Sequence, residues 1–326
     1  MLEVVDPGLL LTLQDHGRTG LAHLGVPPSG ACDPWGLAVA NLLAGAPAGG
    51  VAVEVTLGGA QLRAVETCAI ALAGADLGAE RDDGLLLRAE AVHFLPAGSR
   101  IHFAGSSTGM RAYIGFAGGV AARAVLGSAA TCLPGSLGGI DGRALRAGDR
   151  LEPGRGGDLG ATDRAWPSRM APHPALARGP IRFIPGPDLR HLPPGTMESL
   201  AASAWRVAPA SDRMGLRLDG AALPAGREIL SHPVVPGSIQ VPGDGCPLVH
   251  LVDGPTIGGY PVVGVVPRWE WPRLGQLRPG DPVTFEPQDA AEARAAWREQ
   301  QRRLVAAADA IHADAIWYRL ADCAGG

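Results

Sequence analysis

The sequence contains no lysine, so all 28 of its basic side chains are arginines. Without lysine the chain has no Walker A phosphate loop, forms no Schiff base with pyridoxal phosphate and carries no covalently attached biotin. Aromatic residues make up 5% of the 326 residues and charged residues 18%, against 46% hydrophobic residues, which is typical of a globular protein. The formal net charge of −4 differs from the clustered positive charge of a nucleic-acid-binding surface.

Residues that form disulfides or bind metals are also sparse. The five cysteines are odd in number and include no Cys-x-x-Cys pair, and the nine histidines are dispersed, so we expect no disulfide framework and no metal site. The N-terminal stretch has no basic region and meets Pro7-Gly8 early, unlike a signal peptide, and no apolar run approaches roughly 18 residues. We therefore expect a cytoplasmic protein that binds neither a membrane nor nucleic acid.

Glycine and proline divide the chain into short apolar segments, a pattern typical of a mainly β protein. The segments recur about every ten residues in the N-terminal half and predict a sandwich or a barrel. One helix is expected to begin at Asp33-Pro34, an N-cap followed by proline. The predicted strands are 51–57, 68–73, 85–88, 100–103, 111–116, 181–184, 239–241, 248–252, 262–266 and 283–285.

Composition also suggests the domain boundaries. We expect a first β-rich domain over residues 1–155, a linker or surface excursion over 156–180, and a second β-barrel domain over 181–287. Residues 288–318 contain neither glycine nor proline and are rich in helix formers, so residues 288–326 predict a C-terminal helical extension, as one helix or a pair. The apolar residues expected to share one face of it are Trp297, Leu304, Val305, Ile311 and Ile316.

The first of three stretches that combine glycine with polar side chains lies near the N-terminus. Gln14, Asp15, Arg18, Ser29 and Gly30 belong to a loop that glycine and proline make rigid. Asp15 offers a hydrogen-bond acceptor, and Arg18 offers a fork of donors. We favour a structural loop tied down by an Asp–Arg pair over a catalytic site, because structural ion pairs outnumber catalytic ones.

The second stretch runs from Ser211 to Arg217. Arg213, between small and acidic residues, is suited to bidentate binding of a carboxylate. A β-bulge in which Asp212 caps its own backbone is an equally good interpretation.

The third stretch contains Gln240, Thr256, Gly258, Gly259 and Tyr260. The two glycines permit a close approach of backbone N–H groups to a ligand, as in an anion-binding nest. The three side chains are suited to completing a polar pocket for a small amide or carboxylate. An ordinary hairpin turn at the two glycines is the structural alternative.

Several motifs, in a fixed order over roughly residues 5–287, carry a family resemblance. They are residues 8–43, Glu54-Val-Thr-Leu57, Ala73-Gly-Ala-Asp-Leu77, Arg111-Ala-Tyr113, Gly118-Gly119, Val125-Leu-Gly-Ser128, Ser211-Asp-Arg-Met-Gly215, Ile239-Gln-Val-Pro-Gly243, Thr256 with Gly258-Gly-Tyr-Pro261, and Gln276-Leu-Arg-Pro-Gly-Asp281. They resemble the allophanate hydrolase subunit 2 family, also called the biotin-dependent carboxyltransferase family, which includes the C subunit of 5-oxoprolinase.

The resemblance implies that the β domains are cyclophilin-like barrels. It implies a subunit 1-type partner that is similar to the B subunit of 5-oxoprolinase, with a protein like the A subunit of that enzyme as a further partner, and a small amide or lactam as substrate. The implied activity is ATP-dependent cleavage of 5-oxoproline to glutamate. We expect no cofactor in this chain: ATP belongs to the complex, and biotin to an alternative function.

That alternative is carboxyl transfer from carboxybiotin to urea or a related amide. A non-catalytic regulatory subunit that binds a subunit 1-type protein is the other alternative, because the family motif QTTGGYPK is PTIGGYPV at residues 255–262. In the hydrolytic function, Arg213 clamps a carboxylate, Gln240 recognises an amide, and Gly258-Gly259 stabilises an oxyanion. The candidates for proton transfer are Asp15, Asp253 and Tyr260, among which spacing does not choose.

Overall fold

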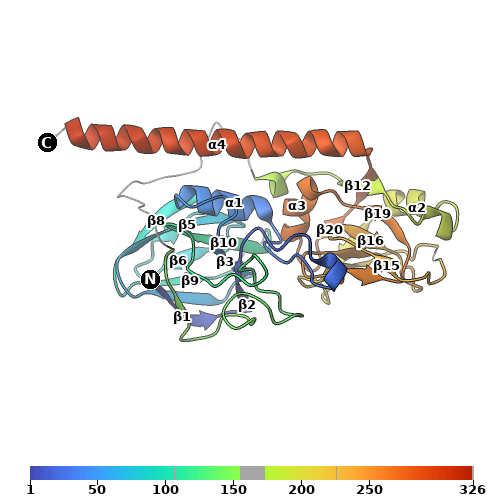
Figure 1. Ribbon diagram of the computed structural model, residues 1–326, viewed down its shortest axis with the longest axis horizontal. Coiled ribbons are helices and arrows are strands. Elements are labelled where there is room, and N and C mark those ends of the chain that lie inside the picture. Colours follow the sequence, from blue (N-terminus) through green and yellow to red (C-terminus); the bar gives the residue numbers. More distant parts are fainter. Residues whose placement is uncertain (106–107, 155–172, 225, 325–326) are drawn as a thin grey trace. The chain divides into compact units, whose positions relative to one another are not determined.

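The computed structural model describes residues 1–105, 108–154, 173–224 and 226–324 (Figure 1). These residues form two compact units: unit 1 contains residues 1–17, 33–173 and 300–326, and unit 2 contains residues 18–32 and 174–299. The division between residues 173 and 174 falls inside the predicted linker 156–180, most of which lies outside the described residues. Residues 18–32 belong to the second unit, although the prediction placed them in the first domain.

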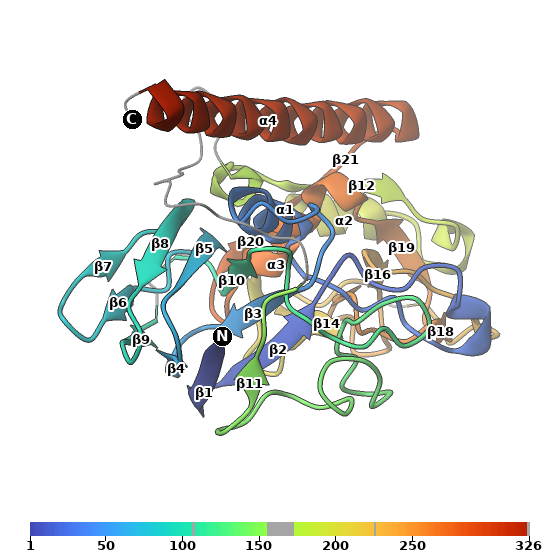
Figure 2. The same cartoon turned by 60° about the vertical axis from the view of Figure 1, so that its left-hand side comes forward.

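Two antiparallel sheets build unit 1 (Figure 2). The six-stranded sheet has the order β11 (Arg150–Leu151), β1 (Leu2–Pro7), β4 (Ala60–Ala64), β9 (Arg100–Phe103), β6 (Ala79–Arg81) and β7 (Leu86–Leu87). The five-stranded sheet has the order β2 (Leu10–Gln14), β3 (Ala52–Thr56), β10 (Arg111–Phe116), β5 (Cys68–Gly74) and β8 (Ala91–Leu95). Alternating apolar side chains such as Leu2 and Val4 of β1 form one core with those of the second sheet.

Helix α1 (Pro34–Leu43) begins where the sequence predicts. The Asp33 carboxylate accepts hydrogen bonds from the N–H groups of Trp35 and Gly36, at 3.1 and 2.9 Å. Nine of its ten residues are buried, and it packs on β5 and β10. The contact is close because Gly115 of β10 has no side chain: a Cβ there would overlap the Ala40 carbonyl of α1.

The Gly115→Ala substitution is therefore expected to destabilise unit 1 by about 1–3 kcal/mol, since the helix must move away from the sheet. Urea unfolding followed by circular dichroism measures the change. Gly243→Ala is the control, because no atom lies within 4 Å of its added Cβ. Equal stability of the two variants would contradict the tight α1–β10 contact.

An eight-stranded, nearly closed sheet builds most of unit 2 (Figure 1). Its order is β20 (Pro282–Val283), β13 (Trp205–Val207), β14 (Gly215–Asp219), β17 (Leu248–His250), β16 (Ser238–Gln240), β19 (Val262–Val265), β12 (Ile181–Pro185) and β21 (Phe285–Pro287). Strands β15 (His232–Pro233) and β18 (Ile257–Gly258) form a separate pair. The remaining short helices are α2 (Thr196–Ala202), α3 (Trp271–Gln276), η1 (Ala22–Leu24), η2 (Pro174–Leu176), η3 (Leu189–His191) and η4 (Arg268–Glu270).

The C-terminal extension is one helix, α4 (Ala290–Ala324), and not a pair. Five of its residues share one helix face, because they are spaced three, four or seven positions apart. They are the buried Ala293, Ala307 and Ile311 and the half-buried Trp297 and Leu304. The prediction that Val305 shares this face is wrong, because Val305 is 62% exposed. It follows Leu304 directly, so the helix turns it about 100° away. The side chain of Ile316 lies outside the described residues.

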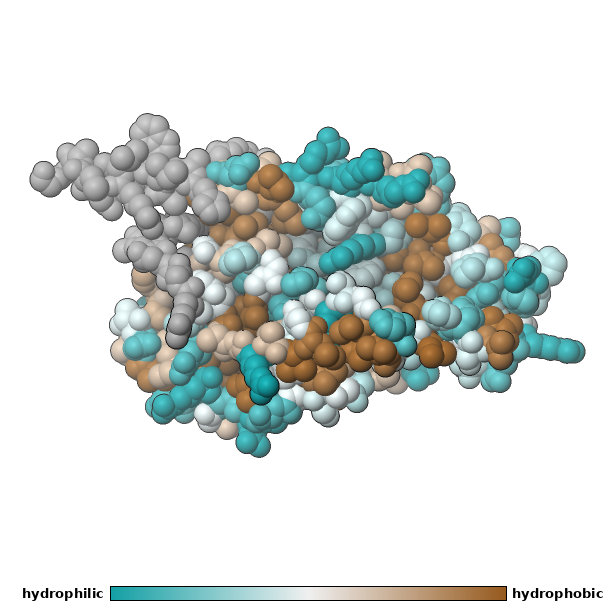
Figure 3. All heavy atoms as spheres, viewed as in Figure 1, coloured by the Kyte–Doolittle hydropathy of each residue, from teal (hydrophilic) through white to brown (hydrophobic). Residues whose placement is uncertain are grey.

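The predicted mainly β fold with a C-terminal helix is confirmed. In the part of the chain that the structure describes, no helix combines the length and the apolar character needed to cross a membrane. Exposed large apolar side chains, such as Leu9 and Leu230, occur in both units, and Figure 3 shows hydrophobic residues in several groups among hydrophilic ones.

Candidate functional site

Arg213 and Asp253 form a buried ion pair in unit 2. The Arg213 side chain is 4% exposed, and its Nε donates to Asp253 Oδ2 at 2.8 Å. Its Nη2 donates to the Gly30 carbonyl at 2.7 Å and to Asp253 Oδ1 at 3.3 Å. Arg213 thus binds a carboxylate through two nitrogens, but this carboxylate is the Asp253 side chain and not a ligand.

The backbone around Arg213 explains how this side chain is aimed. Asp212 accepts hydrogen bonds from the N–H groups of Met214, at 2.7 Å, and of Gly215, at 3.3 Å. Ser211 Oγ accepts from Arg217 N at 3.0 Å. Asp212 therefore caps the turn that leads into β14, while Arg213 pairs with Asp253.

Residues 18–32 contribute backbone groups to the same place. Ser29 N donates to the Val252 carbonyl at 2.9 Å, and Arg18 N donates to the Pro28 carbonyl at 2.8 Å. Ser29 has a φ of 52° and Gly30 a φ of 86°, so the chain turns sharply as it approaches Arg213. The buried Ser29 Oγ has no hydrogen-bond partner among the residues that the structure describes.

Asp15 and Gln14 lie in unit 1 and fasten a distant segment to β2. Asp15 Oδ1 accepts from Gly17 N at 2.7 Å and from Ser128 Oγ at 2.6 Å, and Oδ2 accepts from Ala129 N at 2.7 Å. Gln14 Nε2 donates to the Thr131 carbonyl at 3.1 Å. The Asp15 carboxylate is therefore an anchor for residues 128–131, whereas Asp253, the second candidate for proton transfer, belongs to unit 2.

Gln240 is the centre of a second polar group in unit 2. Its Nε2 donates to the Tyr260 carbonyl at 2.9 Å, so its Oε1 is left to accept from His250 Nε2 at 2.6 Å. This arrangement assigns the proton of the neutral imidazole to Nε2. Burial lowers the pKa of His250 to about 4, and Nδ1 has no hydrogen-bond partner within the described parts of the chain. The network holds the Tyr260 backbone through a neutral side chain.

Gly258 makes room for this network. A Cβ at Gly258 would lie 2.5 Å from Gln240 Nε2. Gly258 and Gly259 both lack the positive φ of a left-handed residue. Gly258 therefore allows the Gln240 side chain to approach the backbone closely without a left-handed turn. Thr256 is buried and its carbonyl accepts from Val234 N at 3.0 Å, while Tyr260 is 36% exposed. Tyr260 is therefore the polar side chain of this segment that solvent or a ligand reaches.

The divergent positions of the 255–262 motif have different surroundings. Ile257, where the family motif has threonine, is 58% exposed. Val262, where the motif has lysine, is 2% exposed and begins β19. Its N–H donates to Asp188 Oδ2 at 2.9 Å. The valine thus serves as a core residue of the sheet.

The two polar groups of unit 2 meet at the end of β17. His250 closes that strand and Asp253 follows three residues later, and a Cβ at the adjoining turn residue Gly254 would lie 3.1 Å from His250 Nδ1. The structure therefore brings Arg213, Asp253, Gln240 and Tyr260 onto neighbouring elements. Sequence reasoning missed His250, although a histidine inside the apolar run 248–252 was a usable signal.

Unit 1 contains a buried polar chain that sequence reasoning did not assemble. The Tyr113 hydroxyl donates to Glu54 Oε2 at 2.7 Å and accepts from Asp33 N at 2.9 Å. The Arg111 Nε lies 3.6 Å from Glu54 Oε1. His173 Nε2 lies 2.8 Å from Asp33 Oδ2. These contacts join β3, β10 and the start of α1, so the polar chain serves as a framework of the unit.

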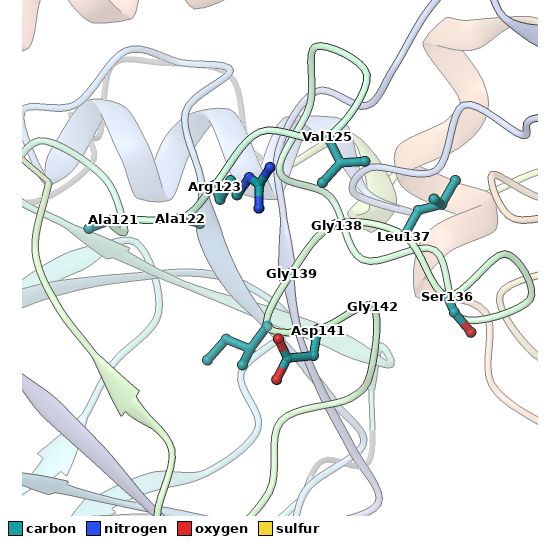
Figure 4. A pocket seen from close by; sticks show the side chains of 11 residues that line it. Ala121, Ala122, Arg123, Val125, Ser136, Leu137, Gly138, Gly139, Asp141 and Gly142 are labelled. Atoms are coloured by element: carbon teal, nitrogen blue, oxygen red, sulfur yellow. The ribbon is translucent and has the colours of Figure 1, made fainter.

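Unit 1 also contains a pocket of about 410 Å³, lined by residues 121–123, 125 and 136–142 (Figure 4). Arg123 and Asp141 lie on opposite sides of it in Figure 4, with Val125 and Leu137 toward the right. This pocket was also missed, although four glycines within residues 135–142 mark an unusual loop. In the described ranges, no group of three or more His, Cys, Asp or Glu side chains is suited to hold a metal.

The model of the carboxyltransferase domain, subdomain A and B, matches residues 24–287. The chain belongs to this family. It is 34% identical to the C subunit of 5-oxoprolinase from Escherichia coli over 93% of this chain and 96% of that protein. The corresponding protein of Haemophilus influenzae is 32% identical over 94% of this chain and 99% of its own length. The predicted resemblance is thus confirmed over nearly the whole chain.

Larger carboxyltransferase-domain proteins contain a similar region. The urea amidolyase of Lachancea kluyveri is 30% identical over 87% of this chain, which spans only 17% of that protein. The crystal structure of the Kluyveromyces lactis urea amidolyase matches with a TM-score of 0.83 and 28% identity, over 93% of this chain and 20% of that one. The carboxyltransferase-domain fold therefore occurs both as a separate chain and as part of longer ones.

Proposed function

We propose that this chain is one component of a 5-oxoprolinase-type assembly that opens the lactam of 5-oxoproline to glutamate at the expense of ATP. The observation that carries the proposal is the end-to-end match to proteins named as the C subunit of 5-oxoprolinase. The urea amidolyases, in contrast, match through about one sixth of their length. The name of the 5-oxoprolinase relatives implies further subunits, which we propose are counterparts of the A and B subunits of that enzyme.

In this assembly the polar groups of unit 2 position segment 255–260. The Gln240 amide holds the Tyr260 carbonyl, and His250 holds the amide. The Arg213–Asp253 pair fixes the adjacent turn and the Gly30 carbonyl. We assign substrate contact to the Tyr260 hydroxyl, because Tyr260 is the exposed polar side chain of this segment. We assign ATP binding to another chain of the assembly.

The test is co-expression with the two partner subunits, of the A type and the B type, and measurement of glutamate released from 5-oxoproline. We expect release only when ATP and all three chains are present. The Tyr260→Phe variant is expected to lower kcat at least tenfold, about 1.4 kcal/mol of barrier, and to leave folding unchanged because only the Tyr260 backbone holds the network. Ser231→Ala, an exposed hydroxyl near Gly259, is the control. An intact three-chain complex without turnover would overturn the proposal.

The likeness to urea amidolyase supports a second candidate, transfer of a carboxyl group from carboxybiotin to an amide. The carboxybiotin would have to reside on another chain, because this one has no lysine. Binding of a biotinylated carrier protein by the assembled complex, with no release of glutamate from 5-oxoproline, would favour this function. If activity appeared only after Pro255→Gln, Ile257→Thr and Val262→Lys were combined, the natural chain would be a binding subunit.

A further inference from the structure

We propose that the pocket of unit 1 between Arg123 and Asp141 binds a free, zwitterionic amino acid with an aliphatic side chain. This inference goes beyond the proposed function, because the pocket lies in the unit that does not contain Arg213, Gln240 or Tyr260. Its volume of about 410 Å³ falls in the range of small-molecule sites, which is roughly 300–1,000 Å³.

The charges of the pocket select the class of ligand. Arg123 and Asp141 both line it, on opposite sides (Figure 4). Among the described residues, neither side chain takes part in a hydrogen bond or a close ion pair. Arg143, which pairs with Asp149, lies near enough to Asp141 to interact with it electrostatically. An anion alone would be attracted by Arg123 and repelled by Asp141. A cation alone would be repelled by Arg123 and attracted by Asp141. A molecule that carries a carboxylate at one end and an ammonium nearby satisfies both groups.

The rest of the wall selects an aliphatic side chain. Val125, Leu137 and Ile140 line the space together with Ala121 and Ala122. A branched aliphatic group is stabilised against such residues because its apolar surface is removed from water. The pocket thus combines an apolar surface with two opposite charges, as the structure of leucine does.

The loop that forms the wall is held in place before any ligand arrives. Gly139 N donates to the Ala129 carbonyl and Gly142 N to the Gly138 carbonyl, both at 2.8 Å. Asp15 holds the other side of Ala129. Gly139 has a φ of 53°, and a Cβ on it would overlap Thr131 Oγ1, so this position accepts only glycine. A preformed wall reduces the ordering cost of binding.

The experiment is calorimetric titration of the full chain with three probes: L-leucine, 4-methylpentanoate, which lacks the ammonium, and 3-methylbutylamine, which lacks the carboxylate. We expect leucine to bind at least tenfold more tightly than either of the others. Arg123→Gln is expected to weaken the binding of leucine and of 4-methylpentanoate at least tenfold. It is expected to leave the binding of 3-methylbutylamine unchanged. Asp141→Asn is expected to weaken the binding of leucine and of 3-methylbutylamine. We choose asparagine because it tolerates the φ of 54° at that position.

Arg88→Gln, an exposed arginine of unit 1 outside the pocket, is the matched control and is expected to bind leucine as the natural chain does. The unfolding midpoint of each variant, measured in parallel, shows that its fold is intact. The proposal is overturned if the natural chain binds no leucine at millimolar concentration. It is also overturned if well-folded Arg123→Gln and Asp141→Asn bind leucine with unchanged affinity, or if 4-methylpentanoate binds as tightly as leucine.

Discussion

The Arg213→Ala variant is expected to unfold with a free energy lower by about 3–5 kcal/mol, because it leaves the Asp253 carboxylate buried without its cation. Asp253 is 1% exposed, and the lost side chain also donates to the Gly30 carbonyl that ties residues 18–32 to the rest of unit 2. Urea unfolding monitored by fluorescence and circular dichroism measures the change. A loss of this size approaches the whole stability of many domains.

A matched pair of variants separates the buried charge from other effects. Arg217→Ala removes an exposed arginine of β14, the strand that follows Arg213, and is expected to change stability by less than about 0.5 kcal/mol. The double variant Arg213→Met with Asp253→Leu is expected to be more stable than Arg213→Ala, since it leaves no unpaired ion. A double variant as unstable as the single one would show that the loss comes from packing or from Gly30, and not from the uncompensated carboxylate.

The stability of unit 2 is expected to fall by about 3 kcal/mol between neutral pH and pH 4 through His250 alone. Burial lowers the folded-state pKa of His250 to about 4, while the unfolded chain takes up the proton near pH 6.5. The unfolded state therefore binds more protons between these values. The contribution is complete above pH 6.5 and is lost progressively as the pH falls toward 4.

Urea unfolding from pH 7.5 to pH 4 measures this effect as the difference between the natural chain and His250→Gln, which takes up no proton. In this difference the contributions of other titrating groups to the pH dependence cancel. One such group is Glu270, whose pKa is raised by burial. His191→Gln, an exposed histidine of unit 2, serves as the control and is expected to keep the natural pH dependence. Parallel curves for the natural chain and His250→Gln would show that His250 does not titrate in this way.

Local sequence patterns predicted about half of the strands and missed others, such as β1, β2, β4 and β14. The run 283–285, predicted as one strand, covers the end of β20 and the start of β21. The run 111–116 is β10 to the residue, and 100–103 is β9, because apolar segments bounded by glycine and proline leave few other conformations. Asp33-Pro34 located the start of α1. Val305 was misplaced: it follows Leu304 directly, and adjacent residues of a helix point about 100° apart.

The candidate site was predictable only in part. Sequence patterns singled out Arg213 and Gln240, but they did not indicate that Arg213 would hold Asp253, 40 residues away, or that His250 would join Gln240. They suggested an anion nest at Gly258, whereas the structure shows a glycine that makes room for the Gln240 amide. Whether these residues bind a substrate stays a prediction that the experiments above test.

The sequence by itself determined which lysine-dependent functions this chain lacks, where about half of its strands and its first helix lie, and the family to which it belongs. These properties depend on composition and on neighbours within a few residues. The tertiary structure decided which polar groups meet: Asp15 with Ser128, 113 residues apart, and Arg213 with Asp253, 40 residues apart. Strand order and register set such distant contacts, because they bring together segments whose sequences carry no local sign of one another.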